Sequence, residues 1–258
     1  MYSLITINTW KCDGEYLNRL EVLKYEIKET RPDILLFQEA FQTVDNTFDT
    51  TEFIAKELGY SYVSSQSRPK KRRMNNILMD SFSNVSILSK FPIERKYIIS
   101  LPSNPDDGSR DAIAAELIIE GKKMLVISIH LSHLRDGNEL RTQQLLHILD
   151  QSFICNKYDA IFIGGDFNFP INKDYLENLS QVNYYLEDTF IFNSKPDIPQ
   201  YTFTNGDFSR KLDHIVQVCK KGEVQAKVAG SEIVFYKDHP VYGIKASDHN
   251  GVKIIFNF

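Results

Sequence analysis

Three consecutive segments in the middle of the chain decide its fold class. They read MLVISIH (Met124–His130), ELRTQQLLHILDQSF (Glu139–Phe153) and AIFIGGDFN (Ala160–Asn168). The first segment, and Ala160–Gly164 in the third, are short apolar runs rich in β-branched residues, which is typical of buried strands. The second segment repeats leucines at helical spacing and predicts an amphipathic helix. The centre of the chain is therefore expected to form a strand, a helix and a second strand, as α/β proteins do.

The same alternation continues toward both ends of the chain. One helix is predicted from the apolar spacing between Leu17 and Ile27, ending before Pro32, and another over Thr51–Leu58. Further strands are predicted over Ser3–Thr9, Asp33–Gln38, Val85–Leu88, Ala112–Ile119, Asp213–Val218, Glu232–Phe235 and Val252–Phe256. Hairpins mixed with βα units predict large mixed sheets with helices outside. No repeat or linker divides the sequence, so residues 1–258 are expected to form a single domain.

Composition narrows the class of protein. The chain has 258 residues, of which 42% are hydrophobic and 25% charged, as in ordinary globular proteins. Its net charge of −4 argues against an overall basic coat for non-specific nucleic-acid binding, but leaves room for local basic patches. Cys12, Cys155 and Cys219 are far apart and form no CxxC pair, which argues against a disulfide framework and a thiolate zinc site.

The sequence shows no sign of export or membrane insertion. The first ten residues lack a basic region followed by a long apolar one, and no run approaches 18 apolar residues. We therefore expect a cytoplasmic protein without a membrane span. No pattern in the sequence indicates an obligate protein partner.

Polar side chains stand where several predicted strands end or begin. They are Asn8, Gln38, Glu39, His130, Asp166, Asn168, Asp213, His214, Asp248 and His249. Strand ends are where α/β proteins gather catalytic groups. Oxygen donors of this kind suit Mg²⁺ or Mn²⁺ rather than zinc, and a histidine beside aspartates can activate water. Because the sequence has no GxSxG motif, the set favours metal-assisted hydrolysis of a phosphate ester.

A series of motifs in the same order resembles the endonuclease/exonuclease/phosphatase family. They are INTW at Asn8, FQEA at Glu39, SNVSILSKFPI at Asn84, SIHL at His130, GGDFN at Asp166, YTF at Thr202, KLDHI at Asp213 and SDH at Asp248. The family includes deoxyribonuclease I, neutral sphingomyelinases, inositol polyphosphate phosphatases and tyrosyl-DNA phosphodiesterases. The resemblance implies a four-layer α/β sandwich of two packed mixed β-sheets flanked by helices.

The resemblance also implies a metal site and a substrate. Glu39 would be the main ligand of Mg²⁺, with Mn²⁺ as an alternative. Asn8 would lie beside it, and Asp248 would contact the ion or its waters. The implied substrate is a phosphate ester, with nucleic acid among the candidates.

Catalytic roles follow from the same resemblance. Asp166 would orient or deprotonate the attacking water, and Asn168 would hold a phosphate oxygen. Asp213 would pair with His249 for acid–base work or phosphate contact, and His130 would bind the phosphate.

Several assignments stay open at this point. The general base is either Asp166 or His249, and the motif histidine is either His130 or His133. Asn84 and Arg110 are candidates for contact with the substrate phosphate, and both also suit structural roles. Thr202 is expected to support its loop rather than to touch substrate.

The dense basic run RPKKRR at residues 68–73 is the main clue to the substrate. It is interpreted either as a loop that attracts phosphate or as a solvated loop without function. The leading functional interpretation is a Mg²⁺-dependent phosphodiesterase or nuclease. A lipid or inositol-phosphate headgroup hydrolase and a catalytically silent phosphate-binding module are the alternatives.

Overall fold

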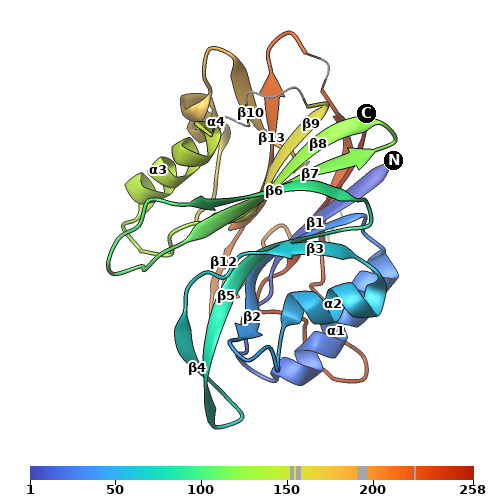
Figure 1. Ribbon diagram of the computed structural model, residues 1–258, viewed down its shortest axis with the longest axis vertical. Helices are drawn as coiled ribbons and strands as arrows, with labels where there is room; N and C mark the ends of the chain where they lie inside the picture. The colour runs from blue at the N-terminus through green and yellow to red at the C-terminus, as the bar shows by residue number, and fades with distance from the viewer. Residues whose placement is uncertain (152–153, 155–157, 191–196, 224) are drawn as a thin grey trace.

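Two mixed β-sheets form the centre of the molecule (Figure 1). The computed structural model describes residues 1–258 except 152–153, 155–157, 191–196 and 224. Within these residues the first sheet has seven strands, with β4 paired to β5. In spatial order they are β14 (Lys227–Val234), β15 (Gly251–Asn257), β1 (Tyr2–Asn8), β2 (Ile34–Thr43), β5 (Ile77–Ser89) with β4 (Lys70–Met74), and β3 (Ser61–Ser64).

The second sheet has six strands in the described residues. In spatial order they are β10 (Tyr184–Asp188), β13 (Asp213–Lys220), β9 (Ala160–Asp166), β8 (Lys122–His130), β7 (Asp111–Ile119) and β6 (Ile93–Ser100). The pairs β1–β2 and β8–β9 are parallel, and their neighbours are antiparallel. A small separate hairpin is formed by β11 (Phe203–Asn205) and β12 (Phe208–Arg210).

Alternation along the strands produces the layers. Leu4 on β1 faces the space between the sheets, where it joins Phe162 of β9, whereas Ile5 and Ile7 face the opposite side. That opposite side is covered by α1 (Tyr16–Thr30) and α2 (Thr50–Leu58), and α3 (Asn138–Leu149) and α4 (Lys173–Leu179) cover the far side of the second sheet (Figure 1). Each fully buried aliphatic or aromatic side chain contributes roughly 1.5–3 kcal/mol relative to exposure. The predicted four-layer sandwich is confirmed.

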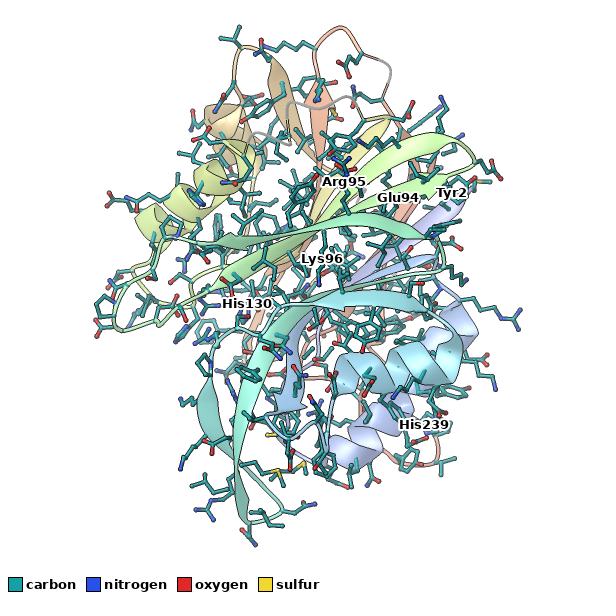
Figure 2. The ribbon with its side chains drawn as sticks, in the orientation of Figure 1. Tyr2, Glu94, Arg95, Lys96, His130 and His239 are labelled. Carbon is teal, nitrogen blue, oxygen red and sulfur yellow. The ribbon has the colours of Figure 1, made fainter. Side chains whose placement is uncertain are left out.

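The edge strand β6 is protected by charge. Glu94, Arg95 and Lys96 are exposed along it, as Figure 2 shows, and β6 has only β7 as a neighbour in its sheet. Charged side chains on an edge strand discourage pairing with a second chain. His130, which Figure 2 also labels, is by contrast buried inside the molecule.

Several predicted boundaries were wrong. β2 runs past Gln38 to Thr43, and β5 begins at Ile77 instead of Val85. The basic run was expected to be a loop, yet its last four residues lie in the strand β4, because they pair along the first residues of β5. The strands β6 and β10–β12 and the helix α4 were not predicted.

The predicted helix over Glu139–Phe153 was too long, because α3 ends at Leu149 and Asp150 and Gln151 follow it outside the helix; Phe153 and Cys155 lie outside the described residues. Cys12 and Cys219 are buried free thiols. None of the helices in the described residues has the length and apolar character that a membrane crossing requires.

The glycine pair of GGDFN lets β9 pack closely on both sides. A Cβ on Gly164 would lie 2.7 Å from Leu36 Cδ1 of the other sheet, and one on Gly165 would lie 1.9 Å from the backbone oxygen of Ile129 on β8. Real Cβ atoms do not approach backbone this closely, so β8 and β9 would have to separate. These glycines therefore fix the position of Asp166, the next residue.

Gly165→Ala is expected to lower the free energy of unfolding by about 3 kcal/mol, the upper end of the usual cost of overpacking. Gly230→Ala is the matched control, because a Cβ there meets no atom within 4 Å. Urea denaturation of both variants measures the difference. Equal stability of the two variants would show that β9 tolerates a side chain at Gly165.

Candidate active site

A cleft of about 570 Å³ lies where the ends of strands from both sheets meet. Asn8 ends β1, and Glu39 lies within β2 at the level where β1 ends. His130 and Asp166 end the parallel strands β8 and β9. The lining also includes Asn168, Asp248, His249 and Arg110. Seven of the ten polar side chains that the sequence singled out therefore converge on this cleft, because parallel neighbours end at the same edge of a sheet, whereas Gln38, Asp213 and His214 are buried and do not line it.

Glu39 reaches the cleft through a bulge in β2. The pairing register with β5 shifts between Phe37 and Ala40, and Glu39 has a φ of 54°. A non-glycine residue in the left-handed region costs free energy and is often found at functional sites. The Glu39 carboxylate contacts the Lys11 ammonium group at 2.8 Å.

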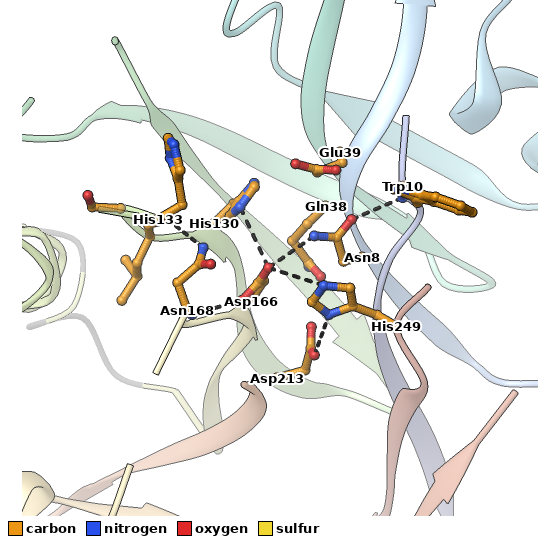
Figure 3. A network of polar contacts seen from close by, with 12 residues as sticks. Asn8, Trp10, Gln38, Glu39, His130, His133, Asp166, Asn168, Asp213 and His249 are labelled. Atoms are coloured by element: carbon orange, nitrogen blue, oxygen red, sulfur yellow. Dashed lines mark hydrogen bonds and ion pairs between the residues drawn. The ribbon is translucent and has the colours of Figure 1, made fainter. Parts of the chain in front are cut away.

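Asp166 is the centre of the polar network in Figure 3. Its Oδ2 accepts a hydrogen bond from Asn8 Nδ2 at 3.0 Å, and its Oδ1 accepts one from the Asn168 backbone N–H at 2.8 Å. His130 Nε2 and His249 Nε2 lie 3.6 Å and 4.0 Å from Asp166 Oδ2. Asn168 Nδ2 donates to the Leu131 carbonyl at 3.0 Å, which fixes the Asn168 side chain against the residue that follows β8.

His249 and Asp213 form a close pair. His249 Nδ1 lies 2.8 Å from Asp213 Oδ2, which leaves Nε2 directed toward Asp166 (Figure 3). Burial alone would lower the pKa of His249, but the Asp213 carboxylate outweighs it and raises that pKa to about 10. The imidazole is therefore held in its protonated form at neutral pH.

Thr202 holds the Asp213 backbone in place. Its Oγ1 accepts hydrogen bonds from the backbone N–H groups of Leu212 and Asp213, at 2.9 and 3.0 Å. Thr202 is fully buried and supports its loop, in line with the sequence-based expectation.

The other two titratable groups at the centre respond mainly to burial. Burial, reinforced by the Asp213 carboxylate, raises the pKa of Asp166 to about 7. Burial and the nearby Arg110 guanidinium lower the pKa of His130 well below its usual value. Asp166 can therefore take up or release a proton near neutral pH, whereas His130 is neutral.

Arg110 is held rigidly at the edge of the cleft. It donates to both carboxylate oxygens of Asp107 at 2.7 Å and to the His130 carbonyl at 3.1 Å. His133 contacts the same Asp107 carboxylate and Arg110. Burial would raise the pKa of Asp107, but Arg110 holds it at about 2. The structure thus places His130 against Asp166 and His133 in the Arg110 network.

Asn84 has partners outside the cleft. Its Nδ2 donates to Gln42 Oε1 at 2.8 Å, and its Oδ1 accepts from the Ser67 backbone N–H at 3.2 Å. It is buried, and the described residues that line the cleft do not include it. This environment favours the structural role over contact with substrate.

Comparison with known proteins decides the family. The sequence model described as "Endonuclease/Exonuclease/phosphatase family" matches residues 5–249. The chain belongs to this family. Its members are metal-dependent phosphoesterases, and the chain is an enzyme of this class. A search of curated proteins finds no match.

Solved structures of the family share the whole fold. TDP2 of D. rerio, complexed with a single-strand DNA product, has 18% identity and a TM-score of 0.74, with 100% of this chain and 99% of that chain covered. A family protein from Leptotrichia buccalis C-1013-b has 16% identity and a TM-score of 0.73, and a mannosyl-6-phosphatase from Bacteroides thetaiotaomicron has 18% and 0.71. For both of these, all of each chain is covered. At these identities the similarity establishes the fold alone.

Two groups of residues in this family member could hold a metal ion. Ligand atoms of Asp166, Asp213 and His249 lie within 4.8 Å of one another. The second group faces the cleft and consists of Glu39, Asp248 and Asn8. Burial and the nearby Glu39 carboxylate raise the pKa of Asp248, although His249 opposes the shift, so a cation between Glu39 and Asp248 would relieve their repulsion.

Sequence reasoning missed several residues of the site. Lys11 and Trp10 line the cleft beside Glu39, and Asp107 orients Arg110. The signal for Asp107 was its spacing of three residues from Arg110 in a turn. The signal for Lys11 was a single cation after the INTW motif, which is common on any protein surface.

Proposed function

We propose that the chain is a Mg²⁺-dependent phosphodiesterase, with Mn²⁺ as an alternative ion, that hydrolyses its substrate by in-line attack of water. The observation that carries this proposal is the convergence of Asp166, His249 and Glu39 on one cleft, with Asp213 buried behind His249 as its partner. A scaffold without activity would have no need for a buried carboxylate whose pKa is raised to about 7.

We place the metal ion at Glu39, with Asn8 and Asp248 completing its protein ligands. Carboxylate and amide oxygens suit hard divalent ions. The Lys11 ammonium group at 2.8 Å from Glu39 supports this, because it shows that the carboxylate accepts a cation on its cleft side. The bound ion would supply positive charge to a phosphate oxygen. The alternative group is less suitable, since two of its ligand atoms, His249 Nδ1 and Asp213 Oδ2, already bind each other at 2.8 Å.

The protein's own groups divide the proton transfers between them. Asp166 is proposed as the acceptor of the proton from the attacking water, since it lies at the centre of the cleft and titrates near neutral pH. His249, held protonated by Asp213, would supply a proton and positive charge beside the reacting phosphate. Asn168, His130 and Arg110 would hold phosphate oxygens.

The openness of the cleft favours a diester over a monoester. The lining runs from Asp166 past Glu39 to the cations of β4, which leaves room for a group on each side of the phosphate. The TDP2 neighbour, with its single-strand DNA product, supports this proposal, whereas the mannosyl-6-phosphatase neighbour supports a monoesterase. A lipid or inositol-phosphate headgroup hydrolase is the remaining alternative.

Initial rates on matched aryl esters test the proposal. With Mg²⁺, kcat/KM for bis(p-nitrophenyl) phosphate is expected to exceed that for p-nitrophenyl phosphate by about tenfold or more, and excess chelator should abolish both activities. A higher value for the monoester, for mannose 6-phosphate or for an inositol phosphate would replace the diesterase proposal with the phosphatase alternative. No hydrolysis of any of these esters or of sphingomyelin would favour the silent module.

A further inference from the structure

The basic run is part of a rigid arm beside the active site. The β4–β5 arm consists of Lys70–Met74, the turn Asn75–Asn76 and Ile77–Ser81, and it extends below the body of the molecule in Figure 1. Met74 pairs with Ile77, and Asn75 and Asn76 have φ angles of 47° and 65°. Two residues with positive φ give the type I′ turn that closes tight hairpins. The arm is therefore an ordered hairpin.

Apolar contacts fix the arm to the segment that contains Lys11 and Cys12, beside Glu39. Met74 is 5% exposed and packs in a small cluster with Cys12, Tyr16 and Phe41, and Met79 packs against the same cluster. Cys12 Sγ also lies 3.9 Å from the Arg73 carbonyl. Because Cys12 follows Lys11 directly, the cations of the arm are held at a fixed place relative to the metal site.

Two arginines of this segment have incomplete charge compensation. Arg72 donates to Ser81 Oγ at 3.0 Å and to backbone carbonyls, and it forms no ion pair within the described residues. Arg68 lies 4.0 Å from an oxygen of Asp107, whose carboxylate already binds Arg110 with both oxygens. Both side chains are half-buried and line the cleft. Half-buried guanidinium groups without carboxylates of their own are suited to binding phosphate.

The rest of the cleft wall continues this pattern. Lys70, Lys71 and Arg73 also line it, so five cations stand within six residues of a chain whose net charge is −4. Trp10, the one tryptophan of the sequence, lines the cleft on the Glu39 side, with the Arg19 guanidinium 4.7 Å from its ring centroid. A basic groove with an aromatic side chain is the arrangement that single-stranded nucleic acids bind.

We propose that the β4–β5 arm and the residue that leads into it bind phosphate groups of a single-stranded nucleic acid next to the scissile one, with Arg72 of the arm and Arg68 just before it as the main contacts. This inference rests on the proposed phosphodiesterase and names its substrate class. The exposed Ile77 and Leu78 near the turn are suited to a lipid surface instead. The position of Arg68 and Arg72 in the cleft, rather than at the turn, favours the nucleic acid.

Binding without turnover gives the first test. A fluorescein-labelled oligothymidylate of ten nucleotides is titrated with the protein in the presence of chelator, which prevents turnover. Fluorescence anisotropy is followed at several salt concentrations. Arg68→Gln/Arg72→Gln is expected to weaken binding about tenfold at 0.1 M salt. It should also reduce the slope of log K against log salt by about 1.4, since each single-strand phosphate contact contributes about 0.7.

Two further variants separate charge from shape. Lys56→Gln/Lys173→Gln removes the same charge from exposed sites on α2 and α4 and should leave binding and slope unchanged. Arg68→Lys/Arg72→Lys keeps the charge and should retain most of the salt slope. Thermal melts check that each variant is folded.

Several results would overturn the inference. They are an unchanged slope in Arg68→Gln/Arg72→Gln, an equal loss in the Lys56/Lys173 control, and binding to phosphatidylserine vesicles that depends on Ile77 and Leu78 while oligothymidylate does not bind. Kinetics distinguish this failure from failure of the proposed function. In the native protein, hydrolysis of bis(p-nitrophenyl) phosphate without oligothymidylate binding leaves the phosphodiesterase intact and removes only the arm's role.

Discussion

His249→Ala and Asp213→Ala are each expected to lower kcat by roughly 10²–10⁴, the usual range for acid–base groups. The two residues act through one contact, the 2.8 Å interaction between His249 Nδ1 and Asp213 Oδ2. Without Asp213 the imidazole loses the carboxylate that keeps it protonated and oriented. Without His249 the carboxylate has no route to the substrate, since Asp213 is fully buried. The double variant should therefore lose little more than the worse single variant.

Steady-state kinetics under saturating metal measure this double-mutant cycle, with bis(p-nitrophenyl) phosphate as substrate. His147→Ala is the matched control, because His147 is exposed on α3 and its imidazole has Gln151 as its hydrogen-bond partner. Losses that multiply fully in the double variant would contradict the pairing. An active His249→Ala would remove this histidine from the mechanism.

The strands with continuous apolar runs could be predicted from sequence because burial on both faces leaves a local signal. β1, β8 and β9 are of this kind. β4 has the sequence KKRRM, which no strand preference favours. It is a strand because β5 offers a partner and Met74 is buried at its end, and both causes are tertiary. The exposed beginning of β5 was missed for the same reason.

The candidate site was predictable to the extent that its residues end strands. Asn8, Glu39, Asp166 and Asp213 stand at strand positions that the sheet topology brings together. The bulge at Glu39 was not predictable, because it is a change of register between β2 and β5 that no single residue encodes. Lys11 and Asp107 were missed because their roles depend on partners that only the fold identifies.

Glu39→Gln is expected to lower Mg²⁺-dependent kcat/KM by roughly 10³, since a bound ion supplies several kcal/mol of charge stabilisation. Glutamine keeps the shape of the side chain but removes the charge that attracts a divalent cation. It also removes the counterion of Lys11. Activity is measured against metal concentration, and higher Mg²⁺ should restore only part of the loss. Full activity at ordinary Mg²⁺ would show that Glu39 does not hold the ion.

The most direct test of the proposed metal site at Glu39 is Mn²⁺ binding in the absence of substrate, compared between Glu39→Gln and Asp213→Asn. Isothermal titration calorimetry gives the affinity, and Trp10 fluorescence gives a second readout, since this tryptophan lies beside Glu39 in the cleft. We expect that Glu39→Gln loses Mn²⁺ binding, whereas Asp213→Asn binds Mn²⁺ within a few-fold of the native protein and still loses turnover. Loss of Mn²⁺ binding in Asp213→Asn, with binding retained in Glu39→Gln, would place the metal among Asp166, Asp213 and His249 and contradict the account.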